Sequence, residues 1–205
     1  MNKNSIFHIR NLVLMGILGG LAAVLMLLQI PVPFAPGFYQ LDFSELPVLV
    51  GAFAIGPMAG VIIEVIKILV NLLLNSTKTS FIGEAANLLM GLAFILPASM
   101  LYQWKKTKKN ALIGLGIGVI VASIVACLAN LYILIPLYIG PKFTMDDLVA
   151  MGTDKNTSIT NLNTLILYAT LPFNLLKFSL VSFATAVLYK HIAPLIKGVH
   201  RANNN

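Results

Sequence analysis

The chain has 205 residues, of which 58% are hydrophobic and 10% are charged. Soluble domains carry about 25% charged residues, so this composition excludes a protein that faces water on all sides and indicates a multi-pass protein of the cell membrane. The net charge of +7 would suit a nucleic-acid-binding protein, but the basic residues flank apolar runs instead of gathering on one face. We therefore expect contact with membrane lipid and none with nucleic acid.

Six helices are predicted, and together they form one all-α transmembrane domain over residues 1–205. At ~20 residues per membrane span, the length leaves no room for a soluble domain. In chain order the predicted helices cover residues 9–30, 44–55, 57–74, 82–103, 111–137 and 161–190. Pro31, Pro33 and Pro36 end the first helix and predict an irregular loop as far as Asp42. Ser44 is the expected N-cap of the second helix.

The basic residues predict the orientation of the bundle. An even number of spans places both termini on one side, and the run Lys105–Lys109 then lies on that side too. By the positive-inside rule this side is cytoplasmic, so the loops after the first, third and fifth helices face outward. The long loop over residues 140–160 is one of them. The first apolar run is too long for a signal peptide and lacks a small-residue cleavage site, so we interpret it as a retained helix.

Several common functional motifs are missing from the sequence. It has no phosphate-binding GxxxxGK[ST] motif, and its three histidines lie near the predicted cytoplasmic ends. Its one cysteine, Cys127, excludes an internal disulfide and a multi-cysteine metal site. We therefore expect neither an enzyme nor a bound metal or cofactor. A small membrane enzyme and a purely structural subunit remain as alternatives.

A proline, an amide and an amine interrupt the middle of the last predicted helix. Asn174 lies two residues after Pro172, and Lys177 lies three residues beyond Asn174, so the two share one face of the helix. Pro172 leaves a backbone carbonyl without its helical partner and predicts a kink. A lysine in the bilayer costs about 3 kcal/mol to insert and should face the bundle interior. We favour a ligand site over a structural ion pair, because no acid of this helix can reach Lys177.

Other polar residues inside the predicted helices have two possible roles. Glu84 and Asn87 share a face near the start of the fourth helix, where the helix dipole explains Glu84 equally well. Asn130 is either a ligand contact or an interhelical hydrogen-bonding residue. Glu64 and Lys67 are three residues apart, and we interpret them as a pair that neutralises itself within one helix.

The convergence of a lysine, several asparagines and a glutamate among Phe, Leu and Met residues predicts the class of ligand. Side-chain amides both donate and accept hydrogen bonds, whereas a lysine donates to carbonyl oxygens. Such a pocket suits a flat, mostly apolar molecule with amide-like edges. A cationic ligand would require an aromatic cage, and Trp104 lies at the wrong end of its helix.

Four short motifs, in their order and spacing, carry a family resemblance over nearly the whole chain. They are Leu41-Asp42-Phe43-Ser44-Glu45-Leu46-Pro47, Gly56-Pro57-x-x-Gly60, Gly83-Glu84-x-x-Asn87 and Pro172-Phe173-Asn174-x-x-Lys177. Together they resemble the riboflavin-specific S component of energy-coupling factor (ECF) vitamin transporters. The resemblance implies a six-helix bundle that binds riboflavin, as transported ligand and not as cofactor, in its outward half under the loop 31–42.

The resemblance also implies roles for individual residues. Asn174 and Lys177 would reach the polar edge of the isoalloxazine ring, and Asn130 is the match for an asparagine of the fifth helix. Two roles remain open for Asp42, a contact to the ribityl hydroxyls and a structural role. Glu45 is expected to cap the second helix. The full set of predicted substrate-binding residues is Asn174, Lys177, Asn130, Glu84, Asn87, Tyr39, Leu41 and Asp42.

Partners follow from the same resemblance. A separate transmembrane coupling protein and two ATPase subunits would supply the energy, which agrees with the missing phosphate-binding motif. Small residues on the first helix, namely Gly16, Gly19, Gly20 and Ala23, by themselves favour packing inside the bundle. The resemblance gives more weight to a contact with the coupling protein. An S component for thiamine or biotin is the alternative within the family, and the Asn174 and Lys177 pair argues against a cationic vitamin.

Overall fold

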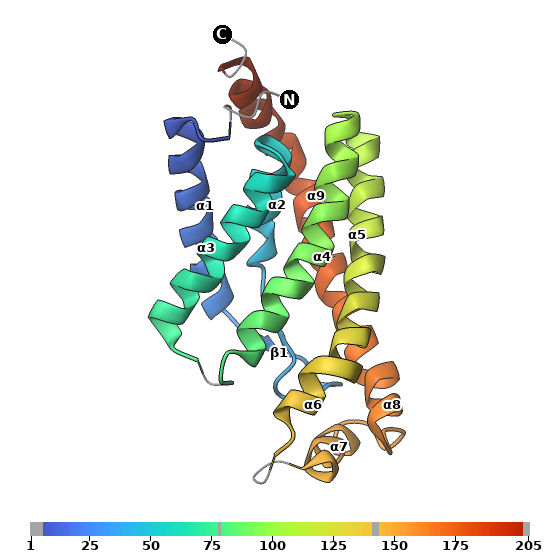
Figure 1. Cartoon of the computed structure of the whole chain (residues 1–205). Helices are drawn as coiled ribbons and strands as arrows, with labels where there is room; N and C mark the ends of the chain where they lie inside the picture. The colour runs from blue at the N-terminus through green and yellow to red at the C-terminus, as the bar shows by residue number, and fades with distance from the viewer. Residues whose placement is uncertain (1–5, 78, 141–143, 203–205) are drawn as a thin grey trace.

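The computed structural model describes residues 6–77, 79–140 and 144–202, with only the backbone course described for 189–202. Long helices run side by side along most of the molecule, and short elements cover one end (Figure 1). The long helices are α1 (Ile9–Leu27), α3 (Pro57–Asn75), α4 (Ile82–Trp104), α5 (Lys108–Ala129) and α9 (Leu171–Ala202). The shorter α2 (Glu45–Ala54) lies among them.

The five long helical stretches are apolar enough to cross a membrane. They are Ile9–Leu27, Pro57–Asn75, Ile82–Trp104, Lys108–Tyr138 and Leu162–Leu188. The prediction of an all-α membrane protein is thereby confirmed. Helix α2 has 10 residues. At about 1.5 Å per residue it reaches only half of the ~30 Å hydrocarbon core. Nearly all of its residues are buried, so α2 is an interior element of the bundle.

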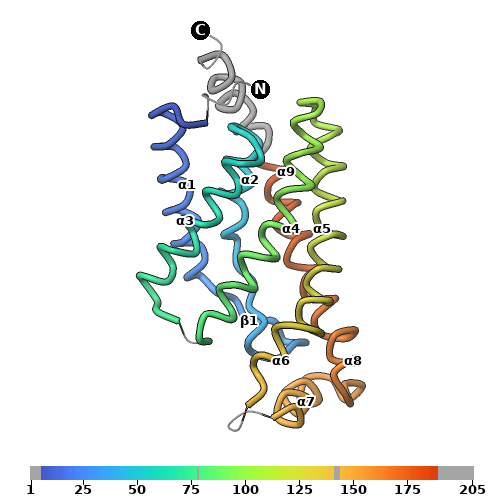
Figure 2. Tube along the Cα trace, viewed as in Figure 1, coloured from blue at the N-terminus to red at the C-terminus, as the bar shows by residue number. Residues whose placement is uncertain are grey.

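The path of the chain brings three segments to the same end of the bundle. Figure 1 shows that α1 begins, α9 ends and α4 turns into α5 at this end. Helix α1 packs against α3, α4 against α5, and α5 against α9, as the tube in Figure 2 traces. The lysine-rich turn between α4 and α5 therefore lies at the end where α1 begins, as the sequence predicts.

The opposite end differs from the prediction in two places. Helix α1 ends at Leu27, and Ile30 belongs to a two-stranded antiparallel hairpin of β1 (Ile30–Pro31) and β2 (Gln40–Leu41). The helix ends three residues earlier than predicted, before the first proline, and the backbone beyond it pairs at two positions instead of staying irregular throughout. The predicted loop 140–160 contains α7 (Met145–Thr153), which begins with a reciprocal capping box of Thr144 and Asp147.

Each of the last two spans contains a π-helical turn that ends two residues before a proline. These turns are η2 (Asn130–Leu134), which leads into α6 (Ile135–Tyr138) and Pro136, and η3 (Ile166–Thr170), which joins α8 (Leu162–Leu165) to α9 at Pro172. Proline lacks the N–H that would bond four residues back, so the ladder shifts to the wider spacing just before it. The structure thus has a π-helical turn before Pro172, where the sequence predicted a kink, and a second one before Pro136, which was not predicted.

Two apolar clusters hold the molecule together. The larger cluster has members on six helices, α1, α2, α3, α4, α5 and α9, and it includes Phe53, Phe94 and Phe178. The smaller one joins the loop 32–39 to α7 and to the segment around η3, with Tyr39 and Phe173 among its members. Between the two clusters the polar residues of the chain converge.

The small residues of α1 face two directions. Gly19 and Ala23 are buried, and a Cβ added at Gly19 would lie 2.4 Å from the Ile66 side chain of α3. A Cβ added at Gly16 or Gly20 would meet no described heavy atom within 4 Å. The predicted partner-contact set therefore divides, because Gly19 and Ala23 are used in packing inside the bundle.

Candidate functional site

A cavity of about 480 Å³ lies between the two apolar clusters. It is lined by residues from α1, the loop and hairpin after it, α2, α3, α4, η2, α6, α7 and α9. Of the predicted substrate-binding residues, seven line this cavity: Asn174, Lys177, Asn130, Glu84, Asn87, Tyr39 and Asp42. Leu41 does not. It pairs with Ile30 in the hairpin and packs against the smaller apolar cluster.

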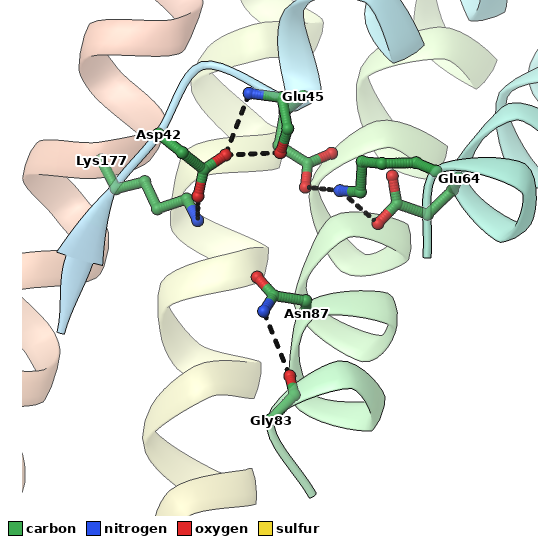
Figure 3. A network of polar contacts seen from close by, with 8 residues as sticks. Asp42, Glu45, Glu64, Gly83, Asn87 and Lys177 are labelled. Carbon is green, nitrogen blue, oxygen red and sulfur yellow. Dashed lines mark hydrogen bonds and ion pairs between the residues drawn. The ribbon is translucent and has the colours of Figure 1, made fainter. Parts of the chain in front are cut away.

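Lys177 forms a buried ion pair at one wall of the cavity. Its Nζ lies 2.8 Å from Oδ2 of Asp42, and the other carboxylate oxygen of Asp42 accepts hydrogen bonds from the backbone N–H and the hydroxyl of Ser44. Figure 3 shows Asp42 and Lys177 pointing toward one another from separate elements. The acid comes from the loop before α2, so our argument against an ion pair, which considered only acids of the same helix, was wrong.

These contacts govern the protonation of Asp42. Burial by itself would raise the pKa of its carboxyl group, but the Lys177 ammonium, the more distant Lys67 and the Ser44 hydrogen bonds outweigh burial and hold this pKa at about 2. Asp42 is therefore ionised at neutral pH. Ser44 does not cap α2 with its side chain, because its hydroxyl donates to Asp42.

A second buried ion cluster lies next to the first. Nζ of Lys67 is 2.7 Å from Oε1 of Glu45 on α2 and 2.7 Å from Oε1 of Glu64 on its own helix. None of the three side chains is more than 2% exposed. Figure 3 shows the Glu45 and Glu64 carboxylates turned toward this shared amine. The expectation that Glu64 and Lys67 pair within one helix is confirmed. Glu45 joins them, and its other oxygen has no hydrogen-bond partner among the described residues, so the expected capping role of Glu45 at α2 is not seen there.

Gly91 of α4 makes room for the two glutamates. A Cβ at this position would lie 2.4 Å from Oε1 of Glu64 and 3.1 Å from Oε1 of Glu45. Contacts under 3.0 Å would force one side chain to move, so the absence of a side chain at Gly91 lets α4 close over the cluster. Glu45 and Gly91 both line the cavity.

Three asparagines line the cavity with the same local geometry. Each amide nitrogen donates to the carbonyl four residues earlier: Asn87 to Gly83 at 3.1 Å, Asn130 to Ala126 at 2.8 Å and Asn174 to Thr170 at 2.8 Å. This bond holds the amide against its own helix. A side-chain amide has two N–H donors and an acceptor oxygen, so each asparagine keeps hydrogen-bonding capacity for a ligand.

Glu84 lies in the first turn of α4 and lines the cavity. Its Oε2 accepts hydrogen bonds from the Thr77 and Thr79 hydroxyls, at 3.2 Å and 3.1 Å. Both explanations offered for Glu84 are therefore compatible with its place, since it lies at a helix N-terminus and also lines the cavity.

Aromatic rings form another wall. The Tyr39 ring lies 4.5 Å from the Phe38 ring and 4.9 Å from the Phe173 ring, centroid to centroid. Its hydroxyl is 2.6 Å from the Thr170 hydroxyl, which ties the loop after α1 to η3. Burial raises the pKa of Tyr39, so it remains a neutral phenol. Phe38 and Phe173 line the cavity but were not among the predicted residues.

A scan of protein-family models places residues 10–189 in one family, described as the substrate-specific component of ECF transporters. The chain belongs to this family. It is a membrane-embedded transport component, and so it is not an enzyme. The resemblance drawn from the four sequence motifs is thereby confirmed at the level of the family.

Relatives and a solved structure agree with this assignment. The S component is 33% identical to "Riboflavin transporter RibU" of Staphylococcus aureus (strain TCH60), over 93% of this chain and 94% of that protein. It is 26% identical to "Riboflavin transporter FmnP" of Bacillus subtilis (strain 168), over 92% and 95%. A solved structure titled "Structure and mechanism of the S component of a bacterial ECF transporter" matches with a TM-score of 0.70 and 31% identity, over 91% of this chain and 96% of that one.

Sequence reasoning missed the ion pairs that connect separate elements of this S component. Asp42 and Lys177 are separated by 135 positions and Glu45 and Lys67 by 22. One signal was available. A membrane protein that buries two lysines must neutralise them. Asp42 and Glu45 lie at a predicted membrane boundary, so they were the available acids to pair with the lysines.

Proposed function

We propose that this S component binds riboflavin in the cavity between its two apolar clusters and serves its uptake across the cell membrane. The observation that carries the proposal is that one cavity is lined both by the neighbouring rings of Tyr39 and Phe173 and by polar side chains such as Asn174 and Lys177. Riboflavin has a flat ring system with an apolar edge and an edge of carbonyl and N–H groups. The relatives named above as riboflavin transporters support the same ligand.

In this proposal each wall contacts a different part of the vitamin. The rings of Tyr39 and Phe173 contact the flat isoalloxazine system, and Asn174 and Lys177 bind its polar edge. Asn130, Asn87 and Glu84 offer further hydrogen bonds to the ring edge or the ribityl hydroxyls. Asp42 acts by holding the Lys177 ammonium, and Leu41 contributes only through the packing of the hairpin.

Titration of purified protein with riboflavin tests the proposal, with quenching of flavin fluorescence as the readout. We expect Lys177→Met to weaken binding about 10- to 100-fold, since a hydrogen bond to a charged group contributes about 1.5–3 kcal/mol. Lys105→Met is the matched control, because Lys105 is exposed at the other end of the bundle. Thiamine and biotin should not compete.

Removal of Lys177 also leaves Asp42 unpaired, so a second variant is needed. The double variant Lys177→Met/Asp42→Asn removes both charges, and it should bind as weakly as the single variant if Lys177 contacts the vitamin. Full recovery of affinity in the double variant would remove Lys177 from the site. Wild-type protein from vitamin-replete cells should be yellow. A colourless preparation that also leaves added riboflavin unquenched would overturn the ligand assignment.

We further propose that the chain passes through the membrane layer six times, with α2 as a short pass and with both termini cytoplasmic. The lysines around the turn between α4 and α5 support this orientation, since this turn lies at the end where α1 begins. The cavity then opens outward. A reporter that is active only in the cytoplasm should work when fused to either terminus, and activity at only one terminus would contradict this topology.

The open face of α1 is the proposed contact with the transmembrane coupling protein, whose two ATPase partners supply the energy. Gly16 and Gly20 carry this part of the proposal, because nothing in the described chain covers them. Gly20→Phe should leave riboflavin binding unchanged and reduce co-purification with the coupling protein. Normal co-purification of this variant would place the contact elsewhere.

A further inference from the structure

Five charged side chains lie at one wall of the cavity or directly behind it, and their charges do not balance. The acids are Asp42, Glu45 and Glu64, and the bases are Lys67 and Lys177. Asp42 and Lys177 neutralise each other through their 2.8 Å contact. Lys67 alone remains for two glutamates, each 2.7 Å from its Nζ. Fully ionised, this second cluster would carry one uncompensated negative charge.

The surroundings make that excess charge costly. Glu45 is 2% exposed and Glu64 is fully buried. Their second oxygens, Oε2 of Glu45 and Oε2 of Glu64, have no hydrogen-bond partner among the described residues. A buried carboxylate without partners is strongly disfavoured, and two carboxylates sharing one site retain a proton.

We propose that Glu45 and Glu64 share one bound proton in the ligand-free protein, and that a ligand entering the cavity displaces it. Glu45 is the connection to the cavity, because it lines the cavity wall whereas Glu64 and Lys67 do not. The displacement of the proton rests on the proposed riboflavin function, whereas the shared proton in the ligand-free protein does not.

The geometry favours a proton over a metal cation. The Lys67 ammonium already occupies the place between the two Oε1 atoms. Gly91 closes the other side, since even a Cβ there would lie 2.4 Å from Oε1 of Glu64. A metal ion would have to displace the ammonium, whereas a proton on one oxygen needs no extra space and creates an O–H donor for the neighbouring carboxylate.

The other charged groups around the cluster leave its imbalance in place. Asp42 is committed to Lys177 and Ser44, so neither Asp42 nor Lys177 compensates Glu45. Glu84, on the same helix as Gly91, lies two turns away, about 10 Å along the axis. Helices α1 and α5 carry Arg or Lys only in their first turns, so their middle parts add no Asp, Glu, Lys, Arg or His to the surroundings of the cluster.

Displacement follows from the place of Glu45 in the cavity wall. A ligand hydroxyl or N–H that hydrogen-bonds to the Glu45 carboxylate favours its ionised form, so binding favours loss of the proton. The proton leaves to water through the cavity, and no other bond forms or breaks. Because the bound state holds fewer protons than the free state, riboflavin affinity should rise with pH.

Two measurements test the inference. Infrared difference spectra of the ligand-free protein should contain the carbonyl band of a protonated carboxylic acid, and Glu64→Gln should abolish it. Riboflavin titration calorimetry in buffers of different ionisation enthalpy should show release of up to one proton by the wild type and none by Glu64→Gln. This variant leaves Glu45 and Lys67 as a balanced pair, so we expect it to fold. Glu45→Gln is the second variant and should behave in the same way.

The outcomes separate this inference from the riboflavin assignment. The infrared measurement needs no ligand, so it decides the shared proton even if riboflavin fails to bind. Absence of the band in the wild type, or its persistence in both glutamine variants, overturns the shared proton. Riboflavin binding whose heat does not depend on the buffer overturns the displacement.

Discussion

The two buried ion clusters lie beside the same cavity but are built differently. Asp42 and Lys177 form a balanced pair, and Ser44 satisfies the remaining oxygen of the acid. Lys67 instead serves two glutamates whose second oxygens lack partners among the described residues. Figure 3 shows the clusters next to one another. The balanced pair ties the loop before α2 to α9, and the unbalanced cluster ties α2 to α3.

In our proposal the two clusters therefore have different roles. A balanced pair with satisfied hydrogen bonds has little reason to change its protonation, so it serves to hold a geometry. A cluster with excess acid stays buried only by taking up a proton, and it therefore responds to whatever reaches it from the cavity. Three experiments separate these roles.

Removal of Lys67 should have the largest effect. Lys67→Met leaves two buried carboxylates with no cation, and breaking a buried pair in this way costs about 3–5 kcal/mol. We expect a large drop in the unfolding temperature in detergent or a loss of folded protein. Lys177→Met is the matched comparison. Lys177 is 7% exposed beside the cavity and Asp42 keeps its Ser44 bonds, so the drop should be smaller. Equal losses would contradict the distinction between the clusters.

Closing the space at Gly91 should have an intermediate effect. Gly91→Ala places a Cβ 2.4 Å from Oε1 of Glu64, and such overpacking costs about 1–3 kcal/mol of folding free energy. Gly116→Ala on α5 is the control, because its Cβ would meet nothing described within 4 Å. Thermal unfolding should show a loss for the first variant and no loss for the second. A loss of similar size in both would remove the steric argument.

The acid response of the balanced pair should be the smallest effect. The pKa of Asp42 is about 2 in the folded protein against an ordinary value of 3.8. A lowered folded pKa means that the pair contributes fully above about pH 4 and that its contribution is lost as the pH falls toward 2. Asp42→Asn should therefore flatten the loss of stability over that range and leave the trend from pH 5 to 8 unchanged. An identical acid loss in wild type and variant would place the acid-sensitive group elsewhere.

Sequence reasoning predicted best where the cause is local. The spans follow from hydropathy, and the irregularity at Pro172 follows from a missing N–H. The contact between Glu64 and Lys67 follows from their spacing of three residues. The hairpin Ile30–Leu41 and helix α7 were not predicted, because a two-residue strand has almost no periodicity and α7 lay in a segment that its polar residues marked as loop.

The sequence by itself determined that this is a helical membrane protein of the S component family, and it placed Asn174, Lys177 and Asn130 among the polar residues to examine. Only the tertiary structure decided which acid neutralises which lysine and which glycines of α1 remain uncovered. The physical reason is the distance along the chain over which each effect acts. Hydropathy and helix periodicity act over a few residues, whereas a buried charge is stabilised by whatever the fold brings within about 3 Å, however distant in the chain.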